Sequence, residues 1–243
     1  MTRLLEGRTA IITGAAGGVG LATARRFAEE GARLLVTDAD EALLEAEMEP
    51  IAASGAEVHR WACDLKAKLG VSNLIASAMD RLGRIDILVN SGLTPVSADI
   101  ISGSVEALDL AYQANVRAPF VLSQAVARRM IEARADRPVE RPDCAIINIT
   151  SIVARRTVPD LLAYSVSCAA LDQLTRAMAV SLAPHGIRVN GLALGAVMSR
   201  KLKAAFSDQK GLREALVKAT PMNRIGEPAE AAEATLFLAS PTS

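Results

Sequence analysis

Short apolar segments alternate with helical patterns along this chain, and the alternation limits the folds that it can adopt. Segments rich in Ile, Leu and Val occupy residues 9–12, 33–37, 57–63, 85–89, 146–149 and 187–192. Stretches with helical periodicity separate them, at residues 19–30, 40–54, 68–82, 104–133 and 161–183. Strands this short and this apolar must be covered on both faces, which requires right-handed βαβ crossovers in a parallel sheet. The sequence therefore predicts an α/β fold, a doubly wound parallel sheet with helices on both faces.

The composition favours one domain with a core of aliphatic side chains. The 243 residues are 51% hydrophobic but only 3% aromatic, as expected where Ala, Val, Leu and Ile pack helices on a parallel sheet. No internal repeat or low-complexity linker divides the chain. Residues 1–243 are therefore expected to form a single domain with a large core. A helix that includes residues 231–238 is expected to be the last element.

The charges and cysteines exclude several classes of function. Lys plus Arg and Asp plus Glu number 27 each, so no net charge attracts the chain to nucleic acid or to an anionic membrane. The Arg-rich stretch at residues 128–141 also contains acidic residues, and residues 134–143 are interpreted as a solvated surface insertion. Cys63, Cys144 and Cys168 lack paired spacing, so neither a metal site nor a disulfide framework is expected. The first residues contain no long apolar run, which argues against a signal peptide or membrane span and favours a cytoplasmic location.

The segment between the first expected strand and the first expected helix is rich in glycine. Gly14, Gly18 and Gly20 lie in the sequence Thr-Gly-Ala-Ala-Gly-Gly-Val-Gly at residues 13–20. Glycine lets the backbone turn tightly and approach a diphosphate, while the free N–H groups and positive dipole of the helix N-terminus favour an anion. A tight turn alone also needs glycine, but after the first strand of a βαβ unit this spacing is typical of a Rossmann-type dinucleotide site. Val19 and the three glycines are the expected cofactor contacts.

Asp38 ends the second expected strand, 18 residues after Gly20. A carboxylate at this place accepts hydrogen bonds from the ribose hydroxyls of adenosine and repels a 2′-phosphate. Gly17 supplies no cation that could offset the repulsion, so NAD is favoured over NADP. The alternative is that Asp38, together with Asp40, caps the following helix.

The two longest helical patterns, at about residues 104–133 and 161–183, are apolar nearly all the way round. One apolar face of each helix serves the sheet, and the surplus face needs another partner. We interpret the surplus faces as a subunit interface, which predicts a dimer or tetramer. A thicker core is the alternative.

The order of the motifs resembles the short-chain dehydrogenase/reductase family, and the resemblance continues almost to the C-terminus. Its motifs include the glycine loop, Gly-Ile-Arg-Val-Asn at residues 186–190, and Pro-x-x-Arg-x-Gly-x-Pro at residues 221–228. The resemblance implies a Rossmann-type fold in which Asp64 and Leu65, after the third strand, lie at the adenine. The final strand of the family is expected to be missing, because the sequence ends soon after the last helix.

Asn90, Ser91 and Gly92 resemble the end of the family's Asn-Asn-Ala-Gly motif. Aligning the glycines puts Asn90 and Ser91 in place of Asn and Ala, and keeps a small residue beside the cofactor. Gly195 and Val197 follow the sixth strand, which the family places beside the nicotinamide. Leu194 replaces the proline that the family has before this glycine.

The resemblance also implies a catalytic set. Ser151 lies 13 residues before Tyr164, the separation found in the family, where the serine holds the carbonyl oxygen and the tyrosine is the acid and base. Asn115, in the segment Asn-Val-Arg-Ala-Pro-Phe, matches the asparagine that supports the family's site.

The family signature Tyr-x-x-x-Lys is broken, because Cys168 stands where the lysine is expected. Residue 168 lies one helical turn after Tyr164 and so on the same face. The family's lysine holds the nicotinamide ribose and favours the tyrosinate, and a thiol does neither. Cys168 is interpreted either as a small residue that fills a buried space or as a reactive thiol. Arg155 and Arg156, in the loop after Ser151, are candidates for a substitute cation.

These features predict an NAD-dependent oxidoreductase that interconverts a small alcohol and its carbonyl. The expected pocket wall consists of apolar residues, Val153, Pro159, Leu194, Val197 and Met198. A substrate lid is expected within about residues 195–226, with its mobile part at 198–219. The alternative is a catalytically weak or inactive dinucleotide-binding scaffold or sensor. A Rossmann methyltransferase is disfavoured, because the set of Ser151, Tyr164 and Asn115 would then be accidental.

Overall fold

The fold is a parallel sheet covered by helices on both faces, as the alternating sequence pattern predicts. The computed structural model describes residues 3–134 and 143–243, with the side chain of Lys201 also left aside, so the insertion predicted at residues 134–143 lies mostly outside the described part. Within it, six strands pair in the order β3-β2-β1-β4-β5-β6, all parallel. The strands are β1 (Thr9–Thr13), β2 (Arg33–Thr37), β3 (Val58–Arg60), β4 (Ile87–Asn90), β5 (Cys144–Ser151) and β6 (Ile187–Leu194). The predicted α/β class is confirmed.

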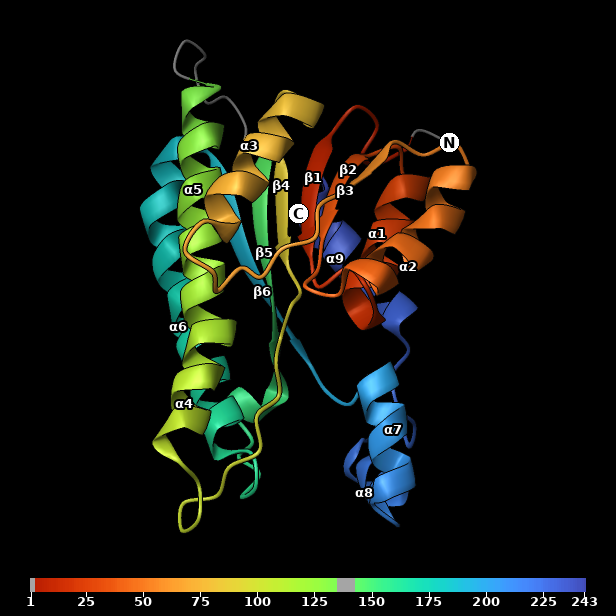
Figure 1. Cartoon of the computed structure of the whole chain (residues 1–243), viewed down its shortest axis with the longest axis vertical. Helices are drawn as coiled ribbons and strands as arrows, with labels where there is room; N and C mark the ends of the chain where they lie inside the picture. Colours follow the sequence, from red (N-terminus) through yellow and green to blue (C-terminus); the bar gives the residue numbers. More distant parts are fainter. Residues whose placement is uncertain (1–2, 135–142) are drawn as a thin grey trace.

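Helices cover both faces of this sheet (Figure 1). One face carries α1 (Gly18–Glu29), α2 (Glu41–Ala53) and α9 (Pro228–Ala239), and the other carries α3 (Gly70–Leu82), α5 (Ala118–Glu132) and α6 (Leu162–Leu182). Alternate strand residues point to opposite layers, so that Ile12 packs toward α1 whereas Ile11 packs toward α3 and α5. Both layers are built from aliphatic side chains, which explains how a chain with few aromatic residues fills its core.

The predicted helix at residues 104–133 is interrupted in its middle. It consists of α4 (Val105–Tyr112), a π-helical turn at Gln113–Arg117 and α5. The predicted helical stretch is therefore confirmed, with a π turn inside it that was not predicted. Apolar periodicity does not reveal the turn, in which Asn115 is buried and forms hydrogen bonds with Thr94 and Ser167. Such single π turns are found mostly at functional sites.

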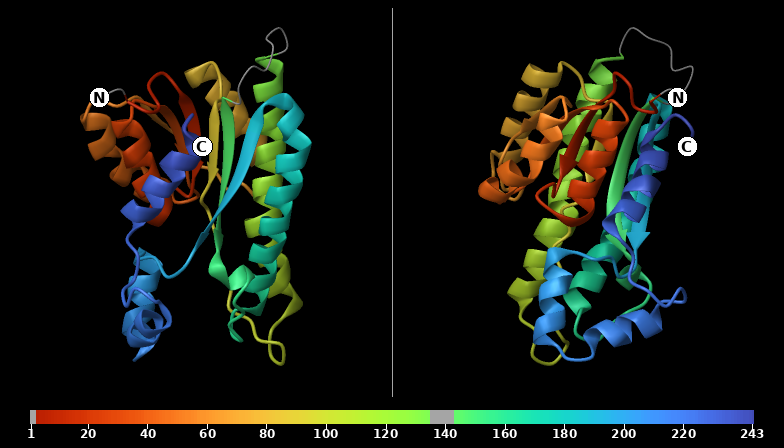
Figure 2. Two further views of the ribbon diagram at one scale, coloured as in Figure 1. Left: turned by 180° about the vertical axis from the view of Figure 1, so that it is seen from behind. Right: turned by 90° about the vertical axis from the view of Figure 1, so that its right-hand side faces the viewer.

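Two short helices, α7 (Arg200–Asp208) and α8 (Leu212–Ala219), lie beyond the carboxyl ends of the strands. The views in Figures 1 and 2 place them at the same end of the molecule as the start of α4 and the segment after β5. They form the part of the chain that was predicted as a lid. Their position puts them at the end of the sheet where ligands of such folds bind.

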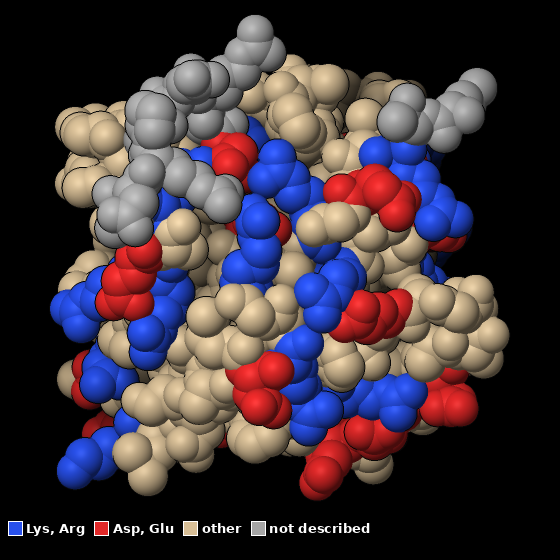
Figure 3. All heavy atoms as spheres, turned by 90° about the horizontal axis from the view of Figure 1, so that it is seen from above, with Lys and Arg blue, Asp and Glu red and all other residues tan. Residues whose placement is uncertain are grey.

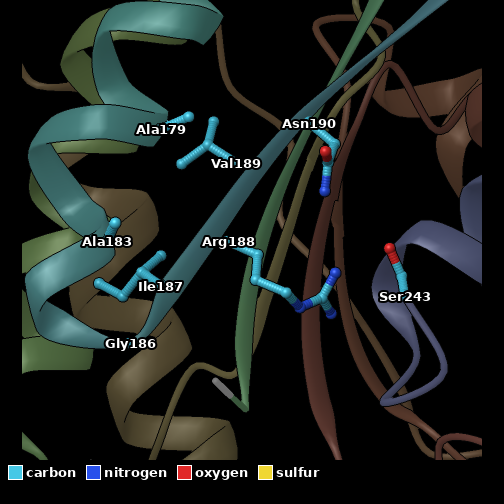
Figure 4. A pocket seen from close by; sticks show the side chains of 8 residues that line it. All are labelled: Ala179, Ala183, Gly186, Ile187, Arg188, Val189, Asn190 and Ser243. Atoms are coloured by element: carbon cyan, nitrogen blue, oxygen red, sulfur yellow. The ribbon is translucent and has the colours of Figure 1, made fainter. Parts of the chain in front are cut away.

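The outer edge of β6 faces a hollow of about 360 Å³ (Figure 4). No strand of the described residues pairs with this edge. Arg188 points from β6 toward the chain end, where its guanidinium donates to the carbonyls of Leu238, Ala239 and Ser240 at distances of 2.6, 3.4 and 3.1 Å. A cation at these carbonyls stabilises the C-terminus of α9.

The surface shows no concentration of one charge on the face seen in Figure 3, where acidic and basic side chains are intermixed. Within the described residues, none of the helices has the length and apolar character needed to cross a membrane. Large apolar side chains are exposed on α4, α5 and α6, namely Val105, Leu108, Leu110, Tyr112, Phe120, Val166 and Val180. These residues include part of the predicted surplus apolar faces.

Candidate active site

The carboxyl ends of β1, β4 and β5 are neighbours in the sheet and carry the predicted site. The chain order reverses between β1 and β4, since β2 and β3 lie on one side of β1 and the later strands on the other. In an open parallel sheet this reversal leaves a crevice at the carboxyl ends of the strands. The glycine loop follows β1, Gly92 follows β4, and Ser151 ends β5. The fold thus brings together three segments that are far apart in the sequence.

The glycine loop is packed so tightly that Gly14 and Gly20 leave no room for a side chain. A Cβ atom on Gly20 would lie 2.1 Å from the Gly14 carbonyl oxygen, and one on Gly14 would lie 2.9 Å from the Cα atom of Gly92. Gly14 and Gly18 also have positive φ angles of 65° and 53°. The loop after β1 therefore rests directly on the loop after β4.

The start of α1 offers donors to an anion. Among the described residues, no side chain caps its first turn, and this turn contains no acidic residue. The first N–H groups of a helix have no partner within the helix, so those of Gly18, Val19 and Gly20 are available to a ligand. These donors, in a loop in which Gly14 and Gly20 leave no room for a side chain, fit the diphosphate of a dinucleotide.

Asp38 lies against the same loop. One carboxylate oxygen accepts the Ala16 N–H at 3.1 Å, and the other accepts the Asp40 N–H at 3.2 Å. The capping of α2 belongs to Asp40, whose carboxylate accepts the Leu43 N–H at 3.1 Å. The capping role that was the alternative for Asp38 therefore belongs to Asp40, whereas Asp38 faces the glycine loop.

Two predicted adenine contacts follow β3. The Asp64 side chain is exposed, and it accepts the Lys66 N–H at 2.9 Å and pairs with the Lys66 ammonium at 3.4 Å. Leu65 is partly buried against the core layer of α3. Asp64 is thus accessible, while Leu65 holds the loop to the fold.

Asn90 points into the sheet. Its amide nitrogen donates to Ser123 Oγ at 3.1 Å and to Asn148 Oδ1 at 2.8 Å, and the Asn148 amide donates to Thr175 Oγ1 at 2.8 Å. This buried chain links β4 and β5 to α5 and α6. The sequence reasoning missed Asn148, although a polar residue inside an otherwise apolar strand was a usable signal. Asn90 therefore supports the site from behind, while Gly92 lies on the glycine loop.

Asn115 is fully hydrogen-bonded within the protein. Its side-chain oxygen accepts the Thr94 N–H at 2.7 Å, and its amide donates to the Thr94 carbonyl at 2.9 Å and to Ser167 Oγ at 3.0 Å. The Ser167 hydroxyl in turn donates to the Tyr164 carbonyl at 2.9 Å. Asn115 thus joins the loop after β4 to the turn of α6 that carries Tyr164 and Cys168.

Ser151, Tyr164 and Cys168 meet at the end of β5. A hydrogen bond with Ser151 lowers the pKa of the Tyr164 phenol, but burial and the neighbouring Cys168 raise that pKa far above its ordinary value. Burial and, to a smaller extent, the nearby Asp172 raise the pKa of the Cys168 thiol to about 11, although a hydrogen bond with Tyr164 opposes this shift. Both groups are therefore neutral near pH 7. The Cys168 side chain is completely buried.

Comparison with known proteins agrees with this geometry. A family model described as enoyl-(acyl carrier protein) reductase matches residues 14–243. The chain is 34% identical over 241 residues to the 7alpha-hydroxysteroid dehydrogenase of Escherichia coli (strain K12), an alignment that covers 98% of this chain and 89% of that protein. The chain belongs to the short-chain dehydrogenase/reductase family. The protein is therefore an oxidoreductase of the short-chain dehydrogenase/reductase type.

Two further relatives extend the comparison. The sorbitol dehydrogenase of Cereibacter sphaeroides is 33% identical over 249 residues, which cover 98% of this chain and 92% of that protein. A solved structure of 7α-hydroxysteroid dehydrogenase with NADH and 7-oxo glycochenodeoxycholic acid matches with a TM-score of 0.90 at 32% identity, over 99% of this chain and 90% of that one. The expected family and fold class are confirmed.

The arginine candidates for a substitute cation lie in the segment after β5. The Arg155 guanidinium pairs with the buried Asp172 carboxylate at 3.4 Å, one helical turn beyond Cys168 on α6. Arg156 is exposed, and none of the ion pairs among the described residues includes it. The charge of Arg155 is thus paired with Asp172, an acid near the position of the family's lysine.

The predicted pocket wall lies in two segments at the carboxyl end of the sheet. Val153 is in the short helix after Ser151, and Pro159 is exposed before α6. Leu194 ends β6, and Val197 and Met198 follow it, where Val197 forms a bridge with Gly226. A Cβ atom on Gly195 would meet nothing within 4 Å, so this residue borders open space.

Two lid residues were missed by the sequence reasoning. Ser199 caps α7 by accepting the Leu202 N–H at 3.1 Å, and a Cβ atom on Gly18 would lie 3.8 Å from the Ser199 Cβ atom. The Arg200 guanidinium donates to the Ala16 carbonyl at 3.1 Å. The local sequence does not predict this contact, because Arg200 and Ala16 are 184 residues apart.

Proposed function

We propose that this protein is an NAD(H)-dependent oxidoreductase that interconverts a small alcohol and its carbonyl compound. The observation that carries the proposal is the contact of the Ser151 hydroxyl with the Tyr164 phenol at the carboxyl end of β5, at the same end of the sheet as the glycine loop that follows β1. The dinucleotide, when bound, supplies or accepts the hydride. The chain's own residues bind and orient the reactants and move the proton.

The cofactor-binding residues in this proposal are the predicted ones. Gly14, Gly18, Val19 and Gly20 would hold the diphosphate, and Asp38 would hold the ribose. Asp64 and Leu65 would contact the adenine. The nicotinamide side would be held by Asn90, Gly92, Tyr164, Gly195 and Val197. NAD is preferred over NADP because the Asp38 carboxylate faces the loop on which a 2′-phosphate would rest. The relative solved with NADH supports a nicotinamide dinucleotide.

Ser151 and Tyr164 act on the substrate oxygen in this proposal. Ser151 donates a hydrogen bond to the carbonyl oxygen, and Tyr164 gives its phenolic proton to that oxygen or takes it back. Asn115 is a positioning residue, because its side chain is saturated by Thr94 and Ser167. Residues 195–226, with α7 and α8, form the lid over the substrate.

We propose further that Cys168 replaces the family's lysine and leaves the Tyr164 phenol protonated near pH 7. A buried phenol with a raised pKa keeps its proton near pH 7, so it can donate to a carbonyl but cannot serve as a base for an alcohol. Direct contacts of Cys168 with Tyr164 and its full burial favour this neutral pair over a reactive thiol.

The competing proposal is a weak or inactive dinucleotide-binding scaffold or sensor, which the missing cation favours. The test measures NADH binding and NADH oxidation with a panel of ketones that includes sugar-derived and steroid ketones. Turnover by the wild type, reduced about a hundredfold or more in Tyr164→Phe, supports the enzyme. Tyr112→Phe is the matched control, because Tyr112 is exposed on α4. Binding without turnover, with turnover gained only in Cys168→Lys, would establish the scaffold instead.

A homodimer or homotetramer in the cytoplasm completes the proposal. The exposed apolar side chains of α4, α5 and α6 support association through those helices. Light scattering of the wild type and of Val180→Glu, whose side chain is 78% exposed, tests it. A monomeric wild type at micromolar concentration would contradict it.

A further inference from the structure

Arg200 brings a positive charge from the lid to the glycine loop. It is the first residue of α7, and its Nη2 atom donates to the Ala16 carbonyl at 3.1 Å. The same nitrogen lies 3.4 Å from the place where Gly17 would carry a Cβ atom. The exposed guanidinium therefore lies in van der Waals contact with the position at which a side chain of residue 17 would begin.

The charge of Arg200 is not paired with a carboxylate. None of the ion pairs found among the described residues includes Arg200. Its bond to the Ala16 carbonyl occupies one nitrogen, whereas a guanidinium has five N–H donors. A cation with free donors therefore remains on the loop.

Asp38 and Arg200 both form hydrogen bonds with the backbone of Ala16. Asp38 accepts the Ala16 N–H at 3.1 Å, and Arg200 donates to the Ala16 carbonyl at the same distance. The positive end of α1 begins two residues later, without a capping side chain. Arginine and a helix N-terminus are both suited to phosphate, the arginine because its planar fork matches phosphate oxygens.

We propose that Arg200 binds a phosphate group of the dinucleotide and thereby couples cofactor binding to closure of the lid. The inference rests on the proposed nicotinamide dinucleotide. It revises the argument that no cation near residue 17 could offset the repulsion between Asp38 and a 2′-phosphate. Residue 17 itself carries no cation, but the lid delivers one beside it. The phosphate in question is either part of the diphosphate or the 2′-phosphate of NADP.

The first measurement is the dissociation constant of NADH and of NADPH by calorimetry, for the wild type, Arg200→Met and Arg200→Lys. Arg200→Met is expected to weaken binding about tenfold or more, because it removes a charge-assisted hydrogen bond to phosphate. Arg200→Lys keeps the charge and is expected to retain most of the affinity. Lys203→Met, which removes an exposed charge from the same helix, is the matched control.

The two cofactors distinguish the two phosphates. An equal loss with NADH and NADPH assigns Arg200 to the diphosphate, and a loss confined to NADPH assigns it to the 2′-phosphate. Adenosine, which has no phosphate, is expected to bind the wild type and Arg200→Met equally. Unchanged affinity for both dinucleotides in Arg200→Met, or an equally large loss in Arg200→Lys, would overturn the proposal. If the wild type binds neither dinucleotide, the proposed function fails instead.

Limited proteolysis tests the coupling to the lid. Saturating NADH is expected to slow cleavage within residues 199–219 in the wild type and in Lys203→Met. In Arg200→Met, at NADH concentrations adjusted to give equal saturation, this protection is expected to be lost. Full protection there would show that Arg200 does not couple the lid to the cofactor.

Discussion

Cys168 lies one helical turn after Tyr164 on α6, and it raises the pKa of the phenol beside it. A lysine at the same position would act in the opposite sense, because a nearby cation stabilises the tyrosinate. The difference concerns the proton and leaves the hydride chemistry of the cofactor untouched. The protonation state of Tyr164, and with it the pH dependence of the rates, is therefore the property that this pair should control.

Replacing Cys168 with lysine is expected to increase alcohol oxidation at pH 8 by about tenfold or more, since a cation within a few ångströms lowers a pKa by roughly 1–3 units. The measurement is kcat/KM for NADH formation from the alcohol product of the best ketone substrate. Cys168→Ala removes the thiol without adding a charge and serves as control. An increase of equal size in Cys168→Ala would show that the thiol, and not the missing cation, limits the wild type.

The pH dependence of the wild type should differ between the two directions. The phenol keeps its proton below its raised pKa, so the rate of ketone reduction should be flat from pH 6 to 9. Alcohol oxidation needs the tyrosinate, whose fraction grows about tenfold per pH unit below that pKa, so this rate should still rise at pH 10. A plateau of the oxidation rate near pH 7 would contradict the assignment of Tyr164 as an uncompensated base.

The Cys168 thiol should resist alkylation in the folded protein. It is completely buried, and burial raises its pKa to about 11, so the reactive thiolate is scarce at pH 8. Mass spectrometry after iodoacetamide treatment should find Cys168 modified at least about a hundredfold more slowly than in urea-unfolded protein, given the ordinary thiol pKa of about 8.5. Fast modification of the native enzyme would revive the interpretation of a reactive thiol.

Asn115→Ala should reduce both stability and turnover. The change deletes three hydrogen bonds and removes the side-chain partner of the partly buried Thr94 N–H and carbonyl, at a cost of about 1–3 kcal/mol in the free energy of unfolding. Urea unfolding and kcat are measured together, with Gln113→Ala as control because Gln113 is exposed in the same π turn. A loss of kcat with unchanged stability would give Asn115 a direct catalytic role.

Gly20→Ala should disrupt the glycine loop. The new Cβ atom would lie 2.1 Å from the carbonyl oxygen and 2.7 Å from the carbonyl carbon of Gly14, which are backbone atoms. The loop must shift, so NADH affinity is expected to fall at least about tenfold and the melting temperature to drop by several degrees. Arg25→Ala, on the exposed side of α1, tests whether any change in this helix has the same effect.

The sequence by itself determined the strand and helix order, the glycine loop and the relation between Tyr164 and Cys168. These features depend on local spacing: apolar periodicity defines the layers, tight turns require glycine, and residues four apart share a helix face. Local spacing did not predict the π turn at Asn115 or the hydrogen bonds of this residue with Thr94 and Ser167.

Only the tertiary structure decided which distant groups meet. Arg155 was a candidate for the missing cation, but the fold gives it Asp172 as a partner. Arg200, in the lid, was not a candidate, but the fold places it in hydrogen-bond contact with Ala16, 184 residues away in the sequence. Such contacts depend on how whole elements pack, because a long side chain bonds whatever acceptor the packing places within its reach. Local spacing thus specified the site's components, and packing specified where its charges lie.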